Sequence, residues 1–411
     1  MNANARALPP FETVAAALRK TTEHLAHELA RPSESAPDWN ELEWAVARSA
    51  AAMHGTTALL ANRLRWRGPP LWQSFLTQQR EQSRLRDELI GALLERIDSA
   101  ARGAGLACVA LKGAALRALG LYGPGERPMA DVDLLVRVAD APAVPAVMRR
   151  VGYEQTLIVA RHAIYKPLGR SKPVELGEHV DSPVTVEVHT AVTEDLPARK
   201  VDITARLHAA RAQPGVNPYS TLAALLLHLL LHAAGGVKSR WLRQIQLHDV
   251  ALLAARLTDQ DWRSLLEIAR VDDGLWWAYP PLALVLRYYD CALPAELVRA
   301  ARAACPRILR RVSERKTLTD VSRSNPWFSA LPGIAWSRTP ADLLRYARSR
   351  ALPDRSTRAS ISGLLDSQPQ LRGAHWYQLS QSARVLRWLI SRPTRVHTIT
   401  SVAAALRYPE P

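Results

Sequence analysis

Cysteine is scarce in this chain of 411 residues, and the spacing of Cys108, Cys291 and Cys305 suits neither a disulfide framework nor a zinc motif. Residues 1–20 contain no apolar run of signal-peptide length, so secretion is not expected. The longest apolar run, Leu222–Ala234, has only 13 residues and holds two histidines, whereas a membrane span needs about 20 apolar residues. We therefore predict a buried helix there, no transmembrane segment, and a reducing, cytoplasmic compartment.

Glycine is also sparse, with 19 residues, and the abundance of Ala, Leu and Arg favours a mainly helical protein. Acidic residues are outnumbered by 54 Lys and Arg to 38 Asp and Glu, which gives a net charge of +16. This excess is local: residues 301–411 hold 19 basic and 6 acidic groups, whereas residues 1–100 hold 12 of each. The basic C-terminal quarter is either a site for RNA or another anionic partner, or a solvated helical surface.

The order of predicted elements indicates an α+β, predominantly helical fold with a small mixed sheet. We expect four regions: a helical region at 1–100, an α/β core at 101–215, a helical domain at 216–312, and a basic, Arg-rich region of helices and loops at 313–411. Apolar spacing predicts helices at 11–31, 39–64, 71–101, 114–121, 139–151, 219–234, 239–257, 261–270, 274–289, 294–312 and 375–391. Strands are predicted at 106–111, 131–138, 154–160, 162–167 and 184–190.

Two aspartates stand one residue apart at the start of a predicted strand, in Asp131-Val-Asp133. Alternate residues of a strand point to the same face, so both carboxylates are within reach of one or two shared divalent ions. Mg²⁺ commonly binds one or two carboxylates together with substrate phosphates. An isolated Asp-x-Asp is also common as a solvated strand edge, so the interpretation depends on the neighbouring motifs.

Upstream, Lys112-Gly113 lies between a predicted strand and a predicted helix. Backbone N–H groups at a helix N-terminus favour a phosphate, glycine permits close approach, and lysine adds positive charge. Arg127 either holds a phosphate as well or pairs with Glu126 or Asp131.

The strand near 184–190 alternates valines with polar residues. Glu187 and His189 therefore share one face, where Glu187 is a candidate third carboxylate. Two metal ions held by three carboxylates can activate a hydroxyl group and stabilise a leaving pyrophosphate. His189 is either a proton relay or a hydrogen-bonded neighbour of Glu187.

Taken in order, these motifs resemble the uncharacterised nucleotidyltransferase-like family of the polymerase-β-type superfamily. The likeness covers roughly residues 80–260 and rests on Leu-Lys-Gly at 111–113, Leu-Tyr-Gly-Pro-Gly-Glu-Arg-Pro-Met-Ala-Asp-Val-Asp-Leu-Leu-Val at 121–136, Gly-Tyr at 152–153, Val-Glu-Val-His at 186–189, the histidines at 228 and 232, and the helical run 240–249. The superfamily usually has Gly-Ser or Gly-Gly in the loop, where this chain has Lys112-Gly113-Ala114. Glu187 stands where aspartate is common.

The resemblance implies an Mg²⁺-dependent enzyme with a possible two-metal site. This enzyme would transfer a nucleoside monophosphate from an NTP to a hydroxyl or phosphate acceptor on a small molecule, peptide or protein. ATP binding is expected. By the same likeness, the catalytic and metal-binding residues are Asp131, Asp133 and Glu187. Lys112, Gly113 and Arg127 would hold the nucleotide.

His189, His232 and Arg243 are possible accessory residues. His228 and His232 have the spacing of a helical metal pair, but no glutamate follows His228, so helix packing or a pocket role is favoured over zinc. Arg243 and Asp249 are expected to fix the helical domain against the core.

Two alternative functions remain open. The basic C-terminal quarter motivates an RNA- or tRNA-modifying, toxin-like nucleotidyltransferase. The Lys-Gly-Ala loop motivates a catalytically degenerate nucleotide-binding or scaffold protein.

Overall fold

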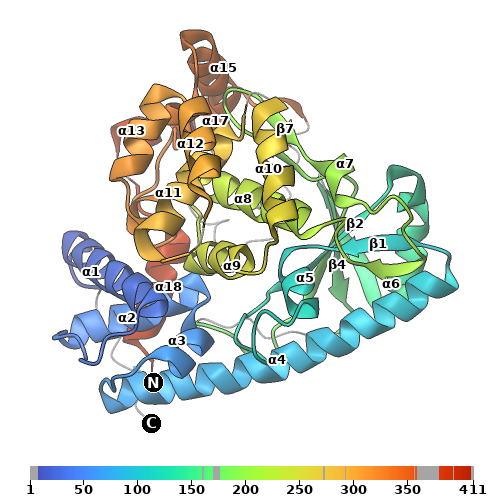
Figure 1. Ribbon diagram of the computed structural model, residues 1–411. Coiled ribbons are helices and arrows are strands. Elements are labelled where there is room, and N and C mark those ends of the chain that lie inside the picture. The colour runs from blue at the N-terminus through green and yellow to red at the C-terminus, as the bar shows by residue number, and fades with distance from the viewer. Residues whose placement is uncertain are drawn as a thin grey trace.

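The computed structural model describes residues 8–159, 162–169, 176–271, 274–291, 293–355, 357–358, 379–391 and 393–408. Helices dominate it, and one mixed six-stranded sheet lies to one side (Figure 1). The predicted α+β, predominantly helical fold is confirmed.

The N-terminal part is entirely helical. It consists of α1 (Phe11–Ala30), α2 (Glu41–His54), α3 (Thr57–Arg63) and the long α4 (Pro70–Gly103). In Figure 1, α4 runs along the base of the molecule from the N-terminal helices to the sheet. The same helix therefore packs on both the helical part and the α/β part.

The α/β part follows directly. Its elements are β1 (Ala107–Ala110), α5 (Lys112–Ala118), β2 (Asp131–Val136), η1 (Val138–Ala143), α6 (Val144–Arg150), β3 (Tyr153–Val159), β4 (His162–Pro167), β5 (Thr185–His189), β6 (Thr193–Asp195), β7 (Lys200–Asp202), α7 (Thr204–Leu207) and β8 (Gly215–Asn217). The sheet order is β3-β4-β5-β2-β1-β8, with β2 parallel to β5 and β1 parallel to β8. The predicted strands of the core are confirmed. The three-residue strands β6, β7 and β8 are too short to show a periodicity in the sequence.

Residue alternation explains how the sheet is covered. Val132, Leu134 and Val136 point to one face, where they join Val186 and Val188 in a core with α4 and α6. Leu135 points to the opposite face, into the core built around α8. The polar residues that alternate with these valines on β2 and β5 are therefore directed toward the α8 side of the sheet.

The C-terminal half is helical again. It contains α8 (Leu222–Ser239), α9 (Gln244–Ala254), α10 (Asp259–Val271), η2 (Trp276–Ala278), α11 (Tyr279–Tyr288), α12 (Ala295–Ala304), α13 (Arg307–Arg315), α14 (Leu318–Val321), η3 (Ile334–Trp336), α15 (Pro340–Ala351), α17 (Gln381–Ile390) and α18 (Val396–Leu406). Among the described residues, α8 is the one helix whose length and composition would allow it to cross a membrane, and 72% of it is buried inside the protein. The predicted buried helix is confirmed.

Segments from both ends of the chain meet around Ser324. Its hydroxyl oxygen lies 2.7 Å from Thr22 Oγ1 on α1 and 2.9 Å from His54 Nε2 on α2. Leu242, just before α9, forms a parallel bridge with Ser322. The C-terminal segment thus packs against the N-terminal helices and against the α8–α9 region, which places Arg323 between them.

The single helix predicted over 39–64 is wrong. It is broken at Gly55, which has φ +66° and closes α2 in the left-handed conformation. The helix predicted over 294–312 is likewise two helices, since Pro306 lacks the N–H that would continue α12. The region after 313, predicted to hold helices and loops, contains α14 and α15, and no helix was predicted at α18.

Replacing Gly55 with alanine tests the need for this left-handed turn. We expect G55A to lower the free energy of unfolding by about 1–2 kcal/mol, because a Cβ disfavours positive φ. The new Cβ would also lie 2.3 Å from the present position of Arg243 Nη2. The matched variant is G103A, where no atom lies within 4 Å and φ is not positive. Equal stability of the two variants in urea denaturation would contradict this explanation.

Candidate active site

Three carboxylates meet on the α8 side of the sheet. Asp131 and Asp133 lie on β2, and Glu187 lies opposite Asp133 on the parallel neighbour β5. Since paired residues of adjacent strands project to the same face, the register brings all three side chains together. Asp133 is buried, Glu187 is partly buried, and Asp131 is open to solvent at the strand start. The structure thus brings together the three predicted acidic residues.

Asp133 has two neighbours at hydrogen-bond distance, Lys112 and His189. Lys112 Nζ donates to Asp133 Oδ1 at 2.9 Å, and His189 Nε2 lies 2.9 Å from the same oxygen. Burial alone would raise the pKa of Asp133, but Lys112 and His189 outweigh it and hold the pKa well below its ordinary value. Asp133 is therefore ionised throughout the physiological range.

The other two carboxylates carry uncompensated repulsion. Desolvation raises the pKa of Glu187 to about 7, with further contributions from Asp133 and Asp131. Surrounding protein and the charge of Asp133 also raise the pKa of Asp131, even though that side chain reaches the surface. Lys112 is the cation that opposes both shifts most strongly. Arg243 and Arg127 also lower the pKa of Asp131.

The Lys112-Gly113 segment is arranged differently from the predicted phosphate loop. Lys112 has φ +47°, and its N–H donates to Tyr219 Oη at 3.1 Å. That hydroxyl lies 2.7 Å from Nδ1 of His228, and burial lowers the pKa of His228 well below 6.5. A Cβ on Gly113 would meet Arg127 Nη1 at 2.2 Å and Met129 Sδ at 2.7 Å. Because Gly113 has no side chain, the side chains of Arg127 and Met129 can pack against its backbone.

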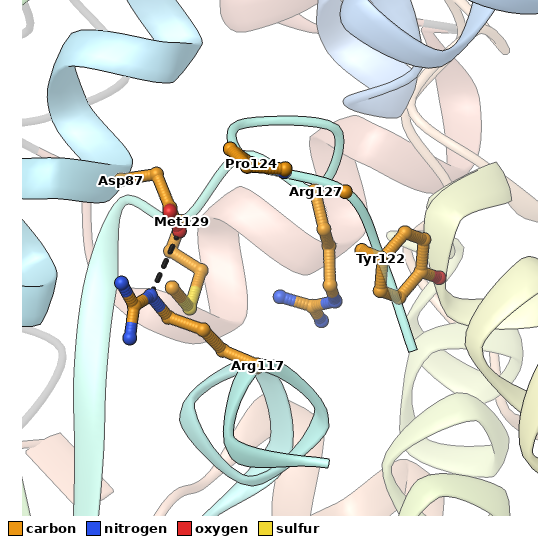
Figure 2. A pocket seen from close by; sticks show the side chains of 8 residues that line it. Asp87, Arg117, Tyr122, Pro124, Arg127 and Met129 are labelled. Carbon is orange, nitrogen blue, oxygen red and sulfur yellow. Dashed lines mark hydrogen bonds and ion pairs between the residues drawn. The ribbon is translucent and has the colours of Figure 1, made fainter. Parts of the chain in front are cut away.

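Arg127 pairs with Asp249 of α9, and the predicted partners Glu126 and Asp131 are wrong. Its Nε and Nη2 donate to the two carboxylate oxygens at 2.8 and 2.7 Å, and Tyr122 Oη donates to Oδ1 at 2.6 Å. Bidentate geometry suits the planar guanidinium, and α9 supplies the carboxylate across the core. In Figure 2, Arg127 lies between Arg117 and Tyr122 and lines a cavity of about 210 Å³. Asp249 thus fixes the helical part against the core.

A second cavity, of about 350 Å³, lies on the other side of Arg127 and includes both aspartates. Arg243 and Arg323 line it with Arg127. Within the described part of the chain, the buried Nε atoms of Arg243 and Arg323 have no hydrogen-bond partner. Burial and Arg243 together lower the pKa of Arg323 to about 10. The two guanidinium groups therefore form a buried positive region that an anion would stabilise.

Sequence reasoning missed Arg323, which lies 190 residues after Asp133 in the basic C-terminal quarter. It also missed Trp241, which lines the same cavity and whose ring centroid lies 4.9 Å from the Arg323 guanidinium carbon. The local charge excess after residue 300 was the one available signal for such an arginine.

A third cavity, of about 200 Å³, lies on the opposite side of Lys112. Glu187 and His189 line it, together with His162, His228 and His232. Burial, and then Lys112, lower the pKa of His232 to about 3, so this ring is neutral at physiological pH. Lys112 and His232 line both this cavity and the cavity of about 350 Å³, so the two cavities adjoin at these residues.

A comparison with protein families matches residues 40–274 to a family described as an uncharacterised nucleotidyltransferase. The chain belongs to this family. The matched region extends from α2 to the end of α10 and contains the three carboxylates, Arg127, Arg243 and Asp249. Arg323 lies beyond it. Comparisons with curated proteins and with solved structures gave no match.

The carboxylate group suits the divalent metal that a nucleotidyltransferase family implies. Asp131 and Asp133 offer hard oxygen ligands on one strand face, and Glu187 adds a third from the paired strand. Desolvation raises the pKa values of Asp131 and Glu187, and the neighbouring carboxylates raise them further. A bound cation would relieve that repulsion.

Breaking the Arg127–Asp249 pair tests its structural role. We expect D249A to lower the free energy of unfolding by about 3–5 kcal/mol, because it leaves a largely buried guanidinium unpaired. The matched control is D290A, which removes the exposed partner of Arg31 and should cost less than about 1 kcal/mol. Similar urea-denaturation midpoints for the two variants would show that the buried pair is not structural.

The raised pKa of Glu187 predicts a pH-dependent stability in metal-free protein. Because its folded-state pKa of about 7 exceeds the ordinary 4.5, the folded protein binds the proton more tightly. This contribution is complete below about pH 4.5 and is lost as the pH rises through 7. With EDTA present, wild type should lose on the order of 1–3 kcal/mol relative to E187Q between pH 5 and pH 8. A constant difference between the two proteins would refute the raised pKa.

Proposed function

We propose that the protein transfers a nucleoside monophosphate from an NTP, with Mg²⁺, to a hydroxyl or phosphate group of a small molecule, peptide or protein, and that it acts in the cytoplasm. The observation that carries this proposal is the placement of Asp131 and Asp133 in the lining of a cavity that three arginines also line, with Glu187 paired to Asp133 on the neighbouring strand. Carboxylates bind the cation and arginines bind phosphate oxygens, and an NTP–metal complex requires both.

The arginines favour a triphosphate in the cavity of about 350 Å³. Arg243 and Arg323 have buried Nε atoms without a partner in the described residues, and their mutual repulsion falls when an anion binds. Arg127 uses Nε and Nη2 on Asp249, so only its Nη1 edge, beside Gly113, faces the ligand. Arg127 is accordingly a secondary contact in this proposal, and Arg243 and Arg323 are the principal ones.

Asp131 and Asp133 hold the metal, and Glu187 completes the site on the side of the third cavity. The cation supplies charge neutralisation for the triphosphate and for the departing pyrophosphate. Lys112 neutralises Asp133 and stays within reach of the phosphates at the boundary of the two cavities. Glu187 lines the third cavity, where it is placed to accept a proton from the acceptor. The acceptor enters through the third cavity, opposite the arginines.

A transfer assay tests the proposal. The purified protein, Mg²⁺ and each α-³²P-labelled NTP are mixed with pools of small molecules, peptides, proteins and tRNA. We expect labelled acceptor and pyrophosphate from wild type, and a loss of at least about 10³-fold in D131N and D133N because the cation is no longer held. D181N, which alters an exposed aspartate, should remain active. Equal labelling by D133N and wild type would refute the assignment, and label on tRNA alone would favour the RNA-modifying alternative.

Arg323 is expected to act on nucleotide affinity. We predict that R323A raises KM for the NTP at least about tenfold, because a charge-assisted contact to phosphate is lost. R345A, which changes an arginine whose side chain is 66% exposed on α15, should leave KM unchanged. An unaltered KM in R323A would exclude Arg323 from the nucleotide site.

A further inference from the structure

Two histidines flank Glu187 at the third cavity. His162 on β4 and His189 on β5 are paired residues of the antiparallel ladder, so their rings project to the same face. His162 Nε2 lies 3.3 Å from Glu187 Oε2, and His189 Nε2 lies 3.8 Å from the same oxygen. One ligand atom from each of the three residues lies within 4.8 Å of the others.

This spacing matches a metal site. Bonds of about 2.0–2.1 Å from zinc to nitrogen or oxygen, at tetrahedral angles, place the ligand atoms roughly 3.4 Å apart. The two measured separations, 3.3 and 3.8 Å, lie near that value. His189 Nε2 also lies 2.9 Å from Asp133 Oδ1, so binding of the ion would require His189 to give up or share that contact.

We propose that His162, His189 and Glu187 bind a divalent first-row transition-metal ion, of which Zn²⁺ is the representative. Imidazole nitrogen favours such ions, whereas Mg²⁺ favours oxygen. The inference rests on the proposed function and specifies its acceptor side. Asp131 and Asp133 offer only oxygen ligands, which suit Mg²⁺ and the triphosphate, whereas Glu187 joins the two histidines on a second, different ion instead of ligating Mg²⁺ or accepting a proton. The oxygen ligands would thus bind Mg²⁺ in one cavity, and the histidine-containing group would bind a different cation in the adjacent cavity.

Three protein ligands leave a fourth position open in a catalytic zinc site. The three proposed ligands line the cavity of about 200 Å³, whose lining also includes His228, His232 and Glu194. An acceptor hydroxyl bound to the ion at the open position would have a lower pKa and would pass its proton to water. This cavity is therefore expected to bind an acceptor molecule that carries a hydroxyl group.

Metal titration without nucleotide tests the site independently of transfer. Full-length protein stripped with EDTA and dialysed is titrated with Co²⁺ in the presence of 5 mM Mg²⁺, followed by visible absorption, and then with Zn²⁺ by competition. We expect one equivalent to bind, and at least tenfold weaker binding in H162A and H189A. H162Q keeps a hydrogen-bonding group beside Glu187 but should also bind at least tenfold more weakly. D131N and the remote H208A should bind like wild type.

Two results would overturn the proposal: no Co²⁺ absorption in folded wild-type protein, or binding that H162A, H162Q and H189A leave unchanged. Circular dichroism confirms that each variant is folded. If transfer from NTP proceeds with Mg²⁺ alone while no Co²⁺ or Zn²⁺ binds, the proposed function stands and this inference fails. If Co²⁺ binds as expected while no acceptor is labelled, the metal site stands and the proposed function fails.

Discussion

The buried carboxylate of Asp133 is the constraint on which the site depends. A buried charge is costly unless cationic or hydrogen-bonding groups compensate it, and Lys112 and His189 supply both at 2.9 Å. Lys112 reaches Asp133 from a left-handed backbone position, and its N–H is in turn held by Tyr219. Tyr219 bonds to His228 on α8. One carboxylate on the sheet is therefore linked through three residues to the helix that covers it.

The same covering helices divide the site into two chemically different sides. Arg127 and Asp249 fix α9 across the core, which leaves Arg243 and Arg323 beside the aspartates. Histidines gather on the opposite side of Lys112. In the proposal, the nucleotide binds in the cavity lined by the arginines, and the acceptor binds in the cavity lined mainly by histidines.

Patterns with a short period could be predicted from the sequence. The alternation in Asp131-Val-Asp133 and in the strand of Glu187 requires only the two-residue repeat of a β-strand, and the structure places these side chains on one face. The partners of Arg127 and the approach of Arg323 could not be predicted, because each depends on contacts more than 100 residues away in the chain. Gly113 lines the cavity of about 350 Å³, and Arg127 and Met129 occupy the place that a Cβ would take there.

Calorimetric titration with a non-hydrolysable NTP tests the central claim, that the carboxylates and arginines form one nucleotide–metal site. The account predicts binding to wild type that weakens at least about tenfold when EDTA replaces Mg²⁺, and that weakens similarly in D131N and D133N with Mg²⁺ present. Binding that is equally tight with EDTA and in both variants, or no binding at all by folded wild-type protein, would contradict it.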